Sequence, residues 1–135
     1  MSREKEIDNA IRWLEQAKAD IRAAEISLNG GSYEWACFQS QQAGEKILKA
    51  YWYHRSLDPW GHSLVKLLNE IPGDRRDFDI AGLMEDAMLL DKMCIPTRYP
   101  NGLPDLIPAS VYSRNEAQAA IDAVKRILVR IEPLL

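Results

Sequence analysis

The cluster with the clearest chemistry in this sequence is Thr97-Arg98-Tyr99-Pro100, which follows a predicted helix and has a proline on either side. A guanidinium binds phosphates and carboxylates through two parallel hydrogen bonds, and a neighbouring phenol ring can stack on a flat ligand. The cluster therefore predicts an anion-binding loop. The sequence leaves a second interpretation open, in which Arg98 only caps the free carbonyl groups at the end of the preceding helix.

A second group of polar residues lies in the segment 33–54. Its apolar residues at steps of three and four predict a buried helical face, and further apolar residues lie on other sides. The predicted face consists of Trp35, Phe38, Ala43, Ile47, Ala50 and Tyr51. This pattern is typical of a central helix that is packed on several faces. The same segment contains Gln39, Gln41, Gln42, Glu45, Lys46 and Lys49. Polar groups this close to a core need partners, so this helix is where we expect a site or an interface.

Several kinds of site are excluded by the composition. The only histidines are His54 and His62, and no HExxH or Cys/His ligand spacing is present, so we expect no metal site. No GxxxxGK[ST] loop, GxGxxG turn or G-x-S-x-G elbow occurs, and we expect no cofactor. Cys37 and Cys94 lie in apolar helical patterns without CxxC spacing, which indicates reduced core residues.

The elements that position these residues are all helical. Helices are expected over residues 2–28, 33–54, 61–71, 77–94 and from about 113 to the end, with 96–108 irregular. Asn29-Gly30-Gly31 breaks the first helix, so the first two helices should form an antiparallel hairpin. No strand pattern is present, and the sequence predicts an all-α bundle.

Length and charge narrow the class further. The 135 residues suit one domain over residues 1–135, long enough for a core without disulfides or metals. The net charge of −3 argues against a broad basic nucleic-acid surface. No apolar run reaches the ~18 residues of a membrane span, and the charged start is unlike a signal peptide. We expect a cytoplasmic protein without a membrane association.

Four stretches carry a family resemblance: WLEQAKADIRAAE at 13–25, YEWACFQSQQAGEKILKA at 33–50, GHSLVKLL at 61–68 and DKMCIPTRYPN at 91–101. Taken together and in order, they resemble the HEPN family (higher eukaryotes and prokaryotes nucleotide-binding domain). The second stretch is the most specific, and the resemblance covers nearly the whole chain. It implies an up-and-down bundle of four to five helices that forms a homodimer through its long helices.

The resemblance also bears on activity. In the ribonuclease branch of the family, an arginine is followed shortly by a histidine, and RNA is cut without a metal. Arg98 has no histidine anywhere after it, so the usual acid–base group is missing, and His62 does not match the motif. The Arg-Tyr-Pro form instead resembles the branch encoded beside a minimal nucleotidyltransferase. There, in a toxin–antitoxin-like pairing, the helical protein is thought to bind a nucleotide or the enzyme.

Matching the family's positions gives candidate nucleotide-binding residues, which are Arg98, Tyr99, Lys46, Lys49, Glu45, Asp20 and His62. The arginine would hold phosphate and Tyr99 would stack on a base. The lysines would add positive charge to the same pocket, and the two carboxylates would orient them. His62 would touch the ligand or cap the short helix that it opens. The alternative for the charged residues is ordinary salt bridging between helices.

Three functions follow as hypotheses. The first is a non-catalytic nucleotide- or polynucleotide-binding module that works as a homodimer with a nucleotidyltransferase. The second is a metal-independent ribonuclease toxin with an altered active site. The third is a pure protein-interaction module, whose surplus aromatic residues Trp35, Trp52, Tyr53 and Trp60 would serve an interface.

Overall fold

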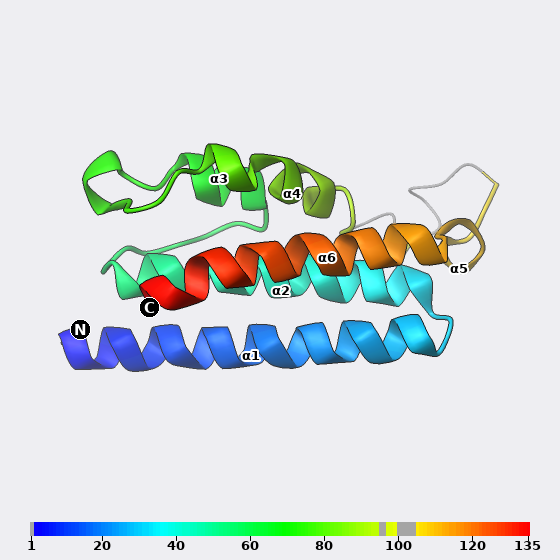
Figure 1. Ribbon diagram of the computed structural model, residues 1–135, viewed down its shortest axis with the longest axis horizontal. Helices are drawn as coiled ribbons and strands as arrows, with labels where there is room; N and C mark the ends of the chain where they lie inside the picture. Colours follow the sequence, from blue (N-terminus) through cyan, green and yellow to red (C-terminus); the bar gives the residue numbers. More distant parts are fainter. Residues whose placement is uncertain (1, 95–96, 100–104) are drawn as a thin grey trace.

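The computed structural model describes residues 2–94, 97–99 and 105–135. Its α-helices are α1 (Arg3–Asn29), α2 (Tyr33–His54), α3 (Leu64–Asn69), α4 (Ala81–Asp91), α5 (Pro108–Val111) and α6 (Arg114–Ile131), with 3₁₀ turns η1 (Gly73–Arg75) and η3 (Glu132–Leu134). Figure 1 shows α1, α2 and α6 side by side as long rods, with α3 and α4 in a layer beyond them. The all-helical bundle predicted from the sequence is confirmed.

The long helices begin and end where their local sequences dictate. The Ser2 hydroxyl caps α1 by accepting the amide of Lys5 at 3.3 Å. Gly31 takes the left-handed conformation, with φ of 82°, that turns the chain into α2 and forms the expected antiparallel hairpin. At the other end of the chain, Ser113 and Glu116 form the expected capping box for α6.

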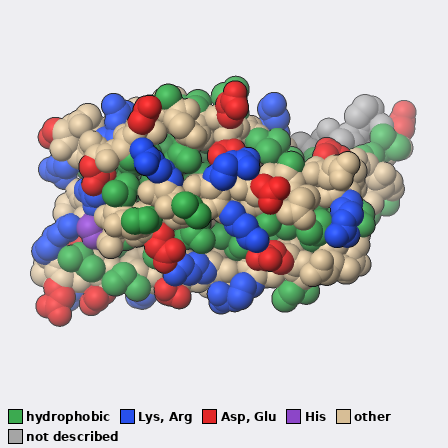
Figure 2. Space-filling view, in the orientation of Figure 1, with side chains coloured by type: hydrophobic (Ala, Val, Ile, Leu, Met, Phe, Trp, Pro, Cys, Tyr) green, Lys and Arg blue, Asp and Glu red, His purple; other side chains and the backbone are tan. Residues whose placement is uncertain are grey.

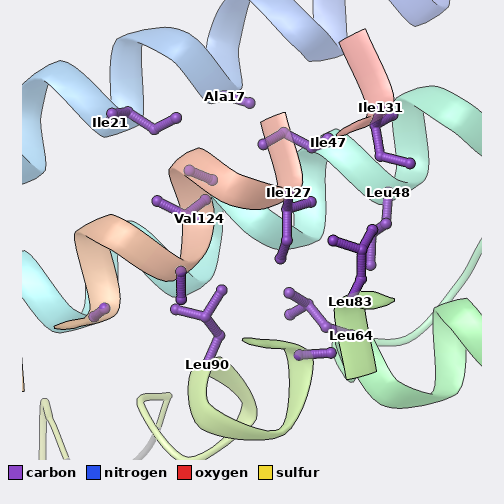
Figure 3. Close-up of a cluster of buried hydrophobic side chains, with 14 of the residues drawn as sticks. Ala17, Ile21, Ile47, Leu48, Leu64, Leu83, Leu90, Val124, Ile127 and Ile131 are labelled. Atoms are coloured by element: carbon purple, nitrogen blue, oxygen red, sulfur yellow. The ribbon is translucent and has the colours of Figure 1, made fainter. Parts of the chain in front are cut away.

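The core surrounds α2, as the apolar pattern of this helix predicts. Figure 3 shows Ile47 and Leu48 of α2 among side chains from every long neighbour. These are Ala17 and Ile21 of α1, Leu64 of α3, Leu83 and Leu90 of α4, and Val124, Ile127 and Ile131 of α6. Each large aliphatic side chain buried here contributes roughly 1.5–3 kcal/mol of transfer free energy, so α2 is held on several faces.

The short helices differ from the predicted ranges because local side-chain caps decide where they begin. α3 begins at Leu64 rather than near 61, since the Ser63 hydroxyl accepts the Lys66 amide at 3.1 Å. α4 begins at Ala81 rather than 77, because the Asp79 carboxylate accepts the Ala81 amide at 3.0 Å and forms a turn. The irregular segment expected at 96–108 includes residues 96 and 100–104, which lie outside the described residues.

Two aromatic residues are not where the sequence pattern places them. The helical period puts Trp35 on the buried face of α2, but its side chain is 48% exposed. Trp52, a candidate interface residue, is buried, and its indole donates to the carbonyl of Leu67 at 3.0 Å. Trp60 is exposed, as the interaction hypothesis requires. None of the helices in the described portion is long and apolar enough to cross a bilayer.

Gly44 lets the outer helices approach α2 closely. A Cβ atom at this position would lie 2.6 Å from Cδ2 of Leu64 and 3.1 Å from Cδ1 of Leu90. The two leucines, from α3 and α4, therefore fill the space that any larger residue would occupy. This close approach lies one residue before Glu45, beside the site described next.

Candidate anion-binding site

Arg98 is positioned by a turn that folds back on the end of α4. The buried Thr97 hydroxyl lies 2.6 Å from the carbonyl oxygen of Met93 and 2.8 Å from that of Cys94. Thr97 thus occupies two carbonyls just beyond α4, and no hydrogen bond from Arg98 to a carbonyl of α4 is found among the described residues. The side chain of Arg98 lies instead over the ring of Phe38 on α2, with Cζ 4.4 Å from the ring centre.

The Arg98 pocket is a hollow of about 360 Å³ beside this contact. Its lining consists of Phe38, Gln42, Glu45, His62, Cys94 and Arg98. The three lining residues from α2 follow one another at steps of four and three, so they lie on one face of the helix. The pocket thus combines an exposed guanidinium, an amide and an imidazole above a buried carboxylate, which suits a polar anionic ligand.

Glu45 is held in place by a buried polar network. One carboxylate oxygen lies 3.2 Å from Nδ1 of His62 and 3.4 Å from Nε2 of Gln41, and the other lies 3.2 Å from Nζ of Lys49. Glu45 is 6% exposed and Lys49 is 8% exposed. Burying either charge alone would be costly, so each depends on the other. This contact between Glu45 and Lys49 is the one that the predicted orienting role of Glu45 requires.

Two residues without a predicted role, Gln41 and Asp91, hold the backbone at and just after His62, whose side chain is 80% exposed. The side chain of Gln41 donates to the backbone carbonyl of His62 at 3.3 Å. Asp91, at the end of α4, accepts the amides of Leu64 at 2.7 Å and Val65 at 3.1 Å. A negative charge at the C-terminus of a helix is unfavourable for that helix. The position of Asp91 at the end of α4 could therefore have indicated from the sequence that it caps a different helix, α3.

Lys46 and Asp20 form a separate pair between α2 and α1. Nζ of Lys46 lies 2.6 Å from the Asp20 carboxylate, whose other oxygen accepts Nε2 of Gln16 at 3.0 Å. Neither residue lines the Arg98 pocket. The structure therefore gathers Arg98, Glu45 and His62, places Lys49 behind Glu45, and leaves Lys46 and Asp20 in the interhelical salt bridge that the sequence allowed as an alternative.

A second hollow, of about 210 Å³, shares Arg98 with the first. This Trp35 hollow is lined by Glu34, Trp35, Thr97, Arg98, Ile107, Pro108 and Ala109. Trp35 stands edge-on to Phe38, with ring centres 6.0 Å apart. The guanidinium thus lies between two hollows of mixed lining, one with Gln42, Glu45 and His62 and the other with Trp35 and Ile107. Tyr99 is half exposed, and its ring centre is 5.0 Å from Cζ of Arg98.

The remaining chemistry of the site is limited. No group of three or more His, Cys, Asp or Glu side chains with metal-binding geometry occurs among the described residues. Burial, followed by the charges of Glu116 and Glu34, raises the pKa of the Cys37 thiol to about 12, so this cysteine stays protonated. Cys94 is a free, half-buried thiol in the wall of the Arg98 pocket.

Comparisons with known proteins agree with the fold. The HEPN domain model matches residues 10–133. No curated protein matches the chain. The structure resembles the crystal structure of TT1696 from Thermus thermophilus, with 43% identity, a TM-score of 0.88, and coverage of 94% of this chain and 98% of that one.

Two further solved structures carry the family name in their descriptions. One is ST0689, an archaeal HEPN homologue, with 32% identity, a TM-score of 0.78 and coverage of 93% of this chain and 97% of that one. The other is the HEPN domain protein tm0613 from Thermotoga maritima, with 35% identity, a TM-score of 0.72 and coverage of 91% and 96%. The chain therefore belongs to the HEPN domain family, a family of helical nucleotide-binding modules.

Proposed function

We propose that this protein binds the phosphate of a nucleotide or polynucleotide at Arg98. The observation that carries the proposal is the state of the guanidinium. It is exposed and stacked on Phe38, and among the described residues it makes no hydrogen bond or ion pair. Stacking fixes the plane of the guanidinium while its donor edge stays available for two parallel hydrogen bonds to phosphate.

The two hollows beside Arg98 support a ligand that extends to both sides of the phosphate. Gln42 and His62 offer hydrogen bonds on one side. Trp35 and Ile107 offer an apolar surface for a base on the other side. In this proposal Glu45 and Lys49 hold the His62 side rigid, Tyr99 stacks on a base, and Lys46 with Asp20 supports the site only by fixing α2 against α1.

Calorimetric titration tests the proposal directly. ATP, GTP, AMP and a short single-stranded RNA are titrated into the protein, into Arg98→Ala and into Arg22→Ala, an exposed arginine on α1 that serves as the matched control. We expect saturable binding that Arg98→Ala weakens about 100-fold, as loss of a charge-assisted bidentate contact does, while Arg22→Ala leaves it unchanged. Equal binding by a folded Arg98→Ala variant would contradict the assignment.

We further propose that the protein acts as a homodimer with a minimal nucleotidyltransferase, in a two-component system of the toxin–antitoxin type. The support is the Arg98-Tyr99-Pro100 form of the family's loop and the absence of a later histidine in the sequence. Light scattering after size-exclusion chromatography measures the first part, with a mass of two chains expected. Copurification with a minimal nucleotidyltransferase encoded beside the gene measures the second part, and separate elution would contradict it.

One observation favours the ribonuclease alternative. His62 and Arg98 line the same pocket, and Glu45 faces Nδ1 of His62, which leaves Nε2 as the proton acceptor. His62 would take the proton of a ribose 2′-hydroxyl while the 2′-oxygen bonds to phosphorus, the bond to the 5′-oxygen breaks, and that oxygen takes a proton from water. Cleavage of RNA in a chelator that is lost in His62→Ala would establish this activity; intact RNA would exclude it.

A further inference from the structure

A groove between α4 and α6 lies apart from the site described above. It encloses about 600 Å³ and is lined by Gly82, Leu83, Lys125, Arg126, Val129, Arg130, Pro133 and Leu134. In the described part of the chain it shares no lining residue with the Arg98 pocket or the Trp35 hollow. Figure 2 shows this face of the molecule, where basic side chains lie beside hydrophobic ones along α6.

The rim of the groove carries an excess of positive charge. Arg126 is matched by Asp86, with 2.8 Å between their closest atoms. Lys125 has only a half-exposed partner, Glu25, at 3.5 Å, a contact that contributes little. Arg130 has no ion-pair partner within residues 2–94, 97–99 and 105–135. Since the whole chain carries a net charge of −3, this local surplus is a distinct feature.

The floor of the groove is apolar and open. Val129 is 73% exposed although it lies on the otherwise amphipathic α6. Gly82 is the second residue of α4, where glycine is less favourable than alanine, and a Cβ atom there would meet nothing within 4 Å. Packing within the chain therefore does not require glycine at this position. What the glycine does provide is bare backbone on which another segment could pack closely.

We propose that this groove docks an acidic amphipathic helix of a partner protein. Such a helix would insert apolar side chains spaced three and four apart over Leu83, Val129 and Leu134, with carboxylates facing Lys125 and Arg130. A nucleotide fits less well, because among the described lining residues there is no aromatic ring to stack on a base. A second copy of the chain is disfavoured, since a two-fold contact would set the same cations against one another.

The test uses a designed helical peptide of about five turns, with leucines at i, i+3, i+4 and i+7 and glutamates flanking them. Its binding is followed by fluorescence anisotropy, beside a matched peptide with glutamine in place of each glutamate. We expect saturable binding of the acidic peptide only. Arg130→Glu and Gly82→Trp should each weaken it at least about tenfold, by charge repulsion and by filling the floor. Gly82→Ala should weaken it less than Gly82→Trp does, and Arg22→Glu, a charge reversal on α1, should leave it unchanged.

Charge exchange sharpens the outcome. A peptide with lysines in place of the glutamates should bind Arg130→Glu better than it binds the parent. Equal affinity of the acidic and glutamine peptides, or no binding of either, would overturn the proposal. So would a concentration-dependent dimer in sedimentation that dissociates in Gly82→Trp, because the groove would then belong to a second copy. None of these results depends on nucleotide binding at Arg98.

Discussion

Two arginines in this bundle make the same contact and have opposite surroundings. Cζ of Arg98 lies 4.4 Å from the ring centre of Phe38, and Cζ of Arg55 lies 4.4 Å from that of Tyr51. Arg55, however, also bonds the Asp77 carboxylate at 2.7 Å and the carbonyl of Leu134 at 3.3 Å. The N–H groups of Arg55 are therefore hydrogen-bonded within the chain. The N–H groups of Arg98 make no hydrogen bond to any of the described residues.

Both rings belong to α2, so the two contacts differ only in what surrounds each arginine. Around Arg55, the buried Tyr51 hydroxyl contacts Asp77 and the carbonyl of Arg75, so the cluster near the end of α2 is closed. Around Arg98, the polar groups border a hollow. The difference supports the proposed role of Arg98 in ligand binding, whereas Arg55 holds the end of α2 to Asp77 and Leu134.

The largest effect expected from breaking this pattern is at Glu45. Glu45→Gln removes the carboxylate that neutralises buried Lys49, and leaving that ammonium unpaired should lower the free energy of unfolding by about 3 kcal/mol. Urea denaturation followed by circular dichroism measures the change. The double variant Glu45→Gln/Lys49→Met should recover most of the loss. An unchanged denaturation midpoint in Glu45→Gln would show that the pair is not energetically buried.

The second largest loss of stability is expected from the removal of Arg55. Arg55→Ala should lower the free energy of unfolding by about 2 kcal/mol, because the ion pair to Asp77 and the stacking on Tyr51 disappear together. Arg98→Ala is the matched variant; it loses only the stacking on Phe38 and should lower the free energy of unfolding by less than about 1 kcal/mol. Similar destabilisation by both substitutions would mean that the hydrogen bonds of Arg55 add no stability beyond the stacking that Arg98 also has.

Tyr51 isolates the hydrogen bonds of the closed cluster from its packing. Tyr51→Phe keeps the edge-to-face contact with Phe78 but leaves the amide of Asp77 and the carbonyl of Arg75 without the hydroxyl. We expect a loss of about 1.5 kcal/mol in thermal or chemical denaturation. Tyr99→Phe, in the open region, serves as the control, and no change in stability is expected there.

The smallest expected effect is a pH dependence of stability at the closed end. Burial, then the charges of Arg55 and Arg3, lower the pKa of His54 from 6.5. The unfolded chain therefore takes up a proton at higher pH than the folded one, and stability should fall as the pH drops below about 6.5. Melting temperatures between pH 7 and 5 measure this decrease, which His54→Gln should abolish.

A second acid step belongs to Asp77. Burial alone would raise the pKa of this carboxyl, but hydrogen bonds from Tyr51 and Arg55 outweigh burial and hold it below 3.8. The ionised Asp77 carboxylate therefore contributes its full share of the stability above pH 3.8. This share is lost as the pH falls through the lower pKa that the group has in the folded state. Asp77→Asn should remove this step and enlarge the His54 step, because the charge of Asp77 partly offsets the lowering of the His54 pKa.

The sequence predicted α2 to the residue, because its apolar pattern runs over several turns and breaks cleanly at both ends. It misjudged the ends of α3 and α4, since Ser63 and Asp79 set the starts and Asp91 contacts α3 from a distant segment. The Glu45–Lys49 pair follows from helical spacing alone.

The rest of the site required the tertiary structure. The contact of Arg98 with Phe38 joins a loop to a helix far away in the sequence, and no local pattern encodes it. The arrival of His62 beside Glu45 depends in the same way on the packing of α3. Trp35 was misplaced because a helical period gives the direction of a side chain but not whether a neighbour covers it.

The absent side chain of Gly44 lets α3 and α4 lie close to α2 beside the Arg98 pocket. Leu64 and Leu90 sink into the space above this glycine, and they stand two residues after His62 and one before Asp91. A methyl group at position 44 would displace Leu64 or Leu90, and with them the segments that carry His62 and Cys94 of the pocket lining. The position of two pocket residues thus depends on a buried residue that does not line the pocket.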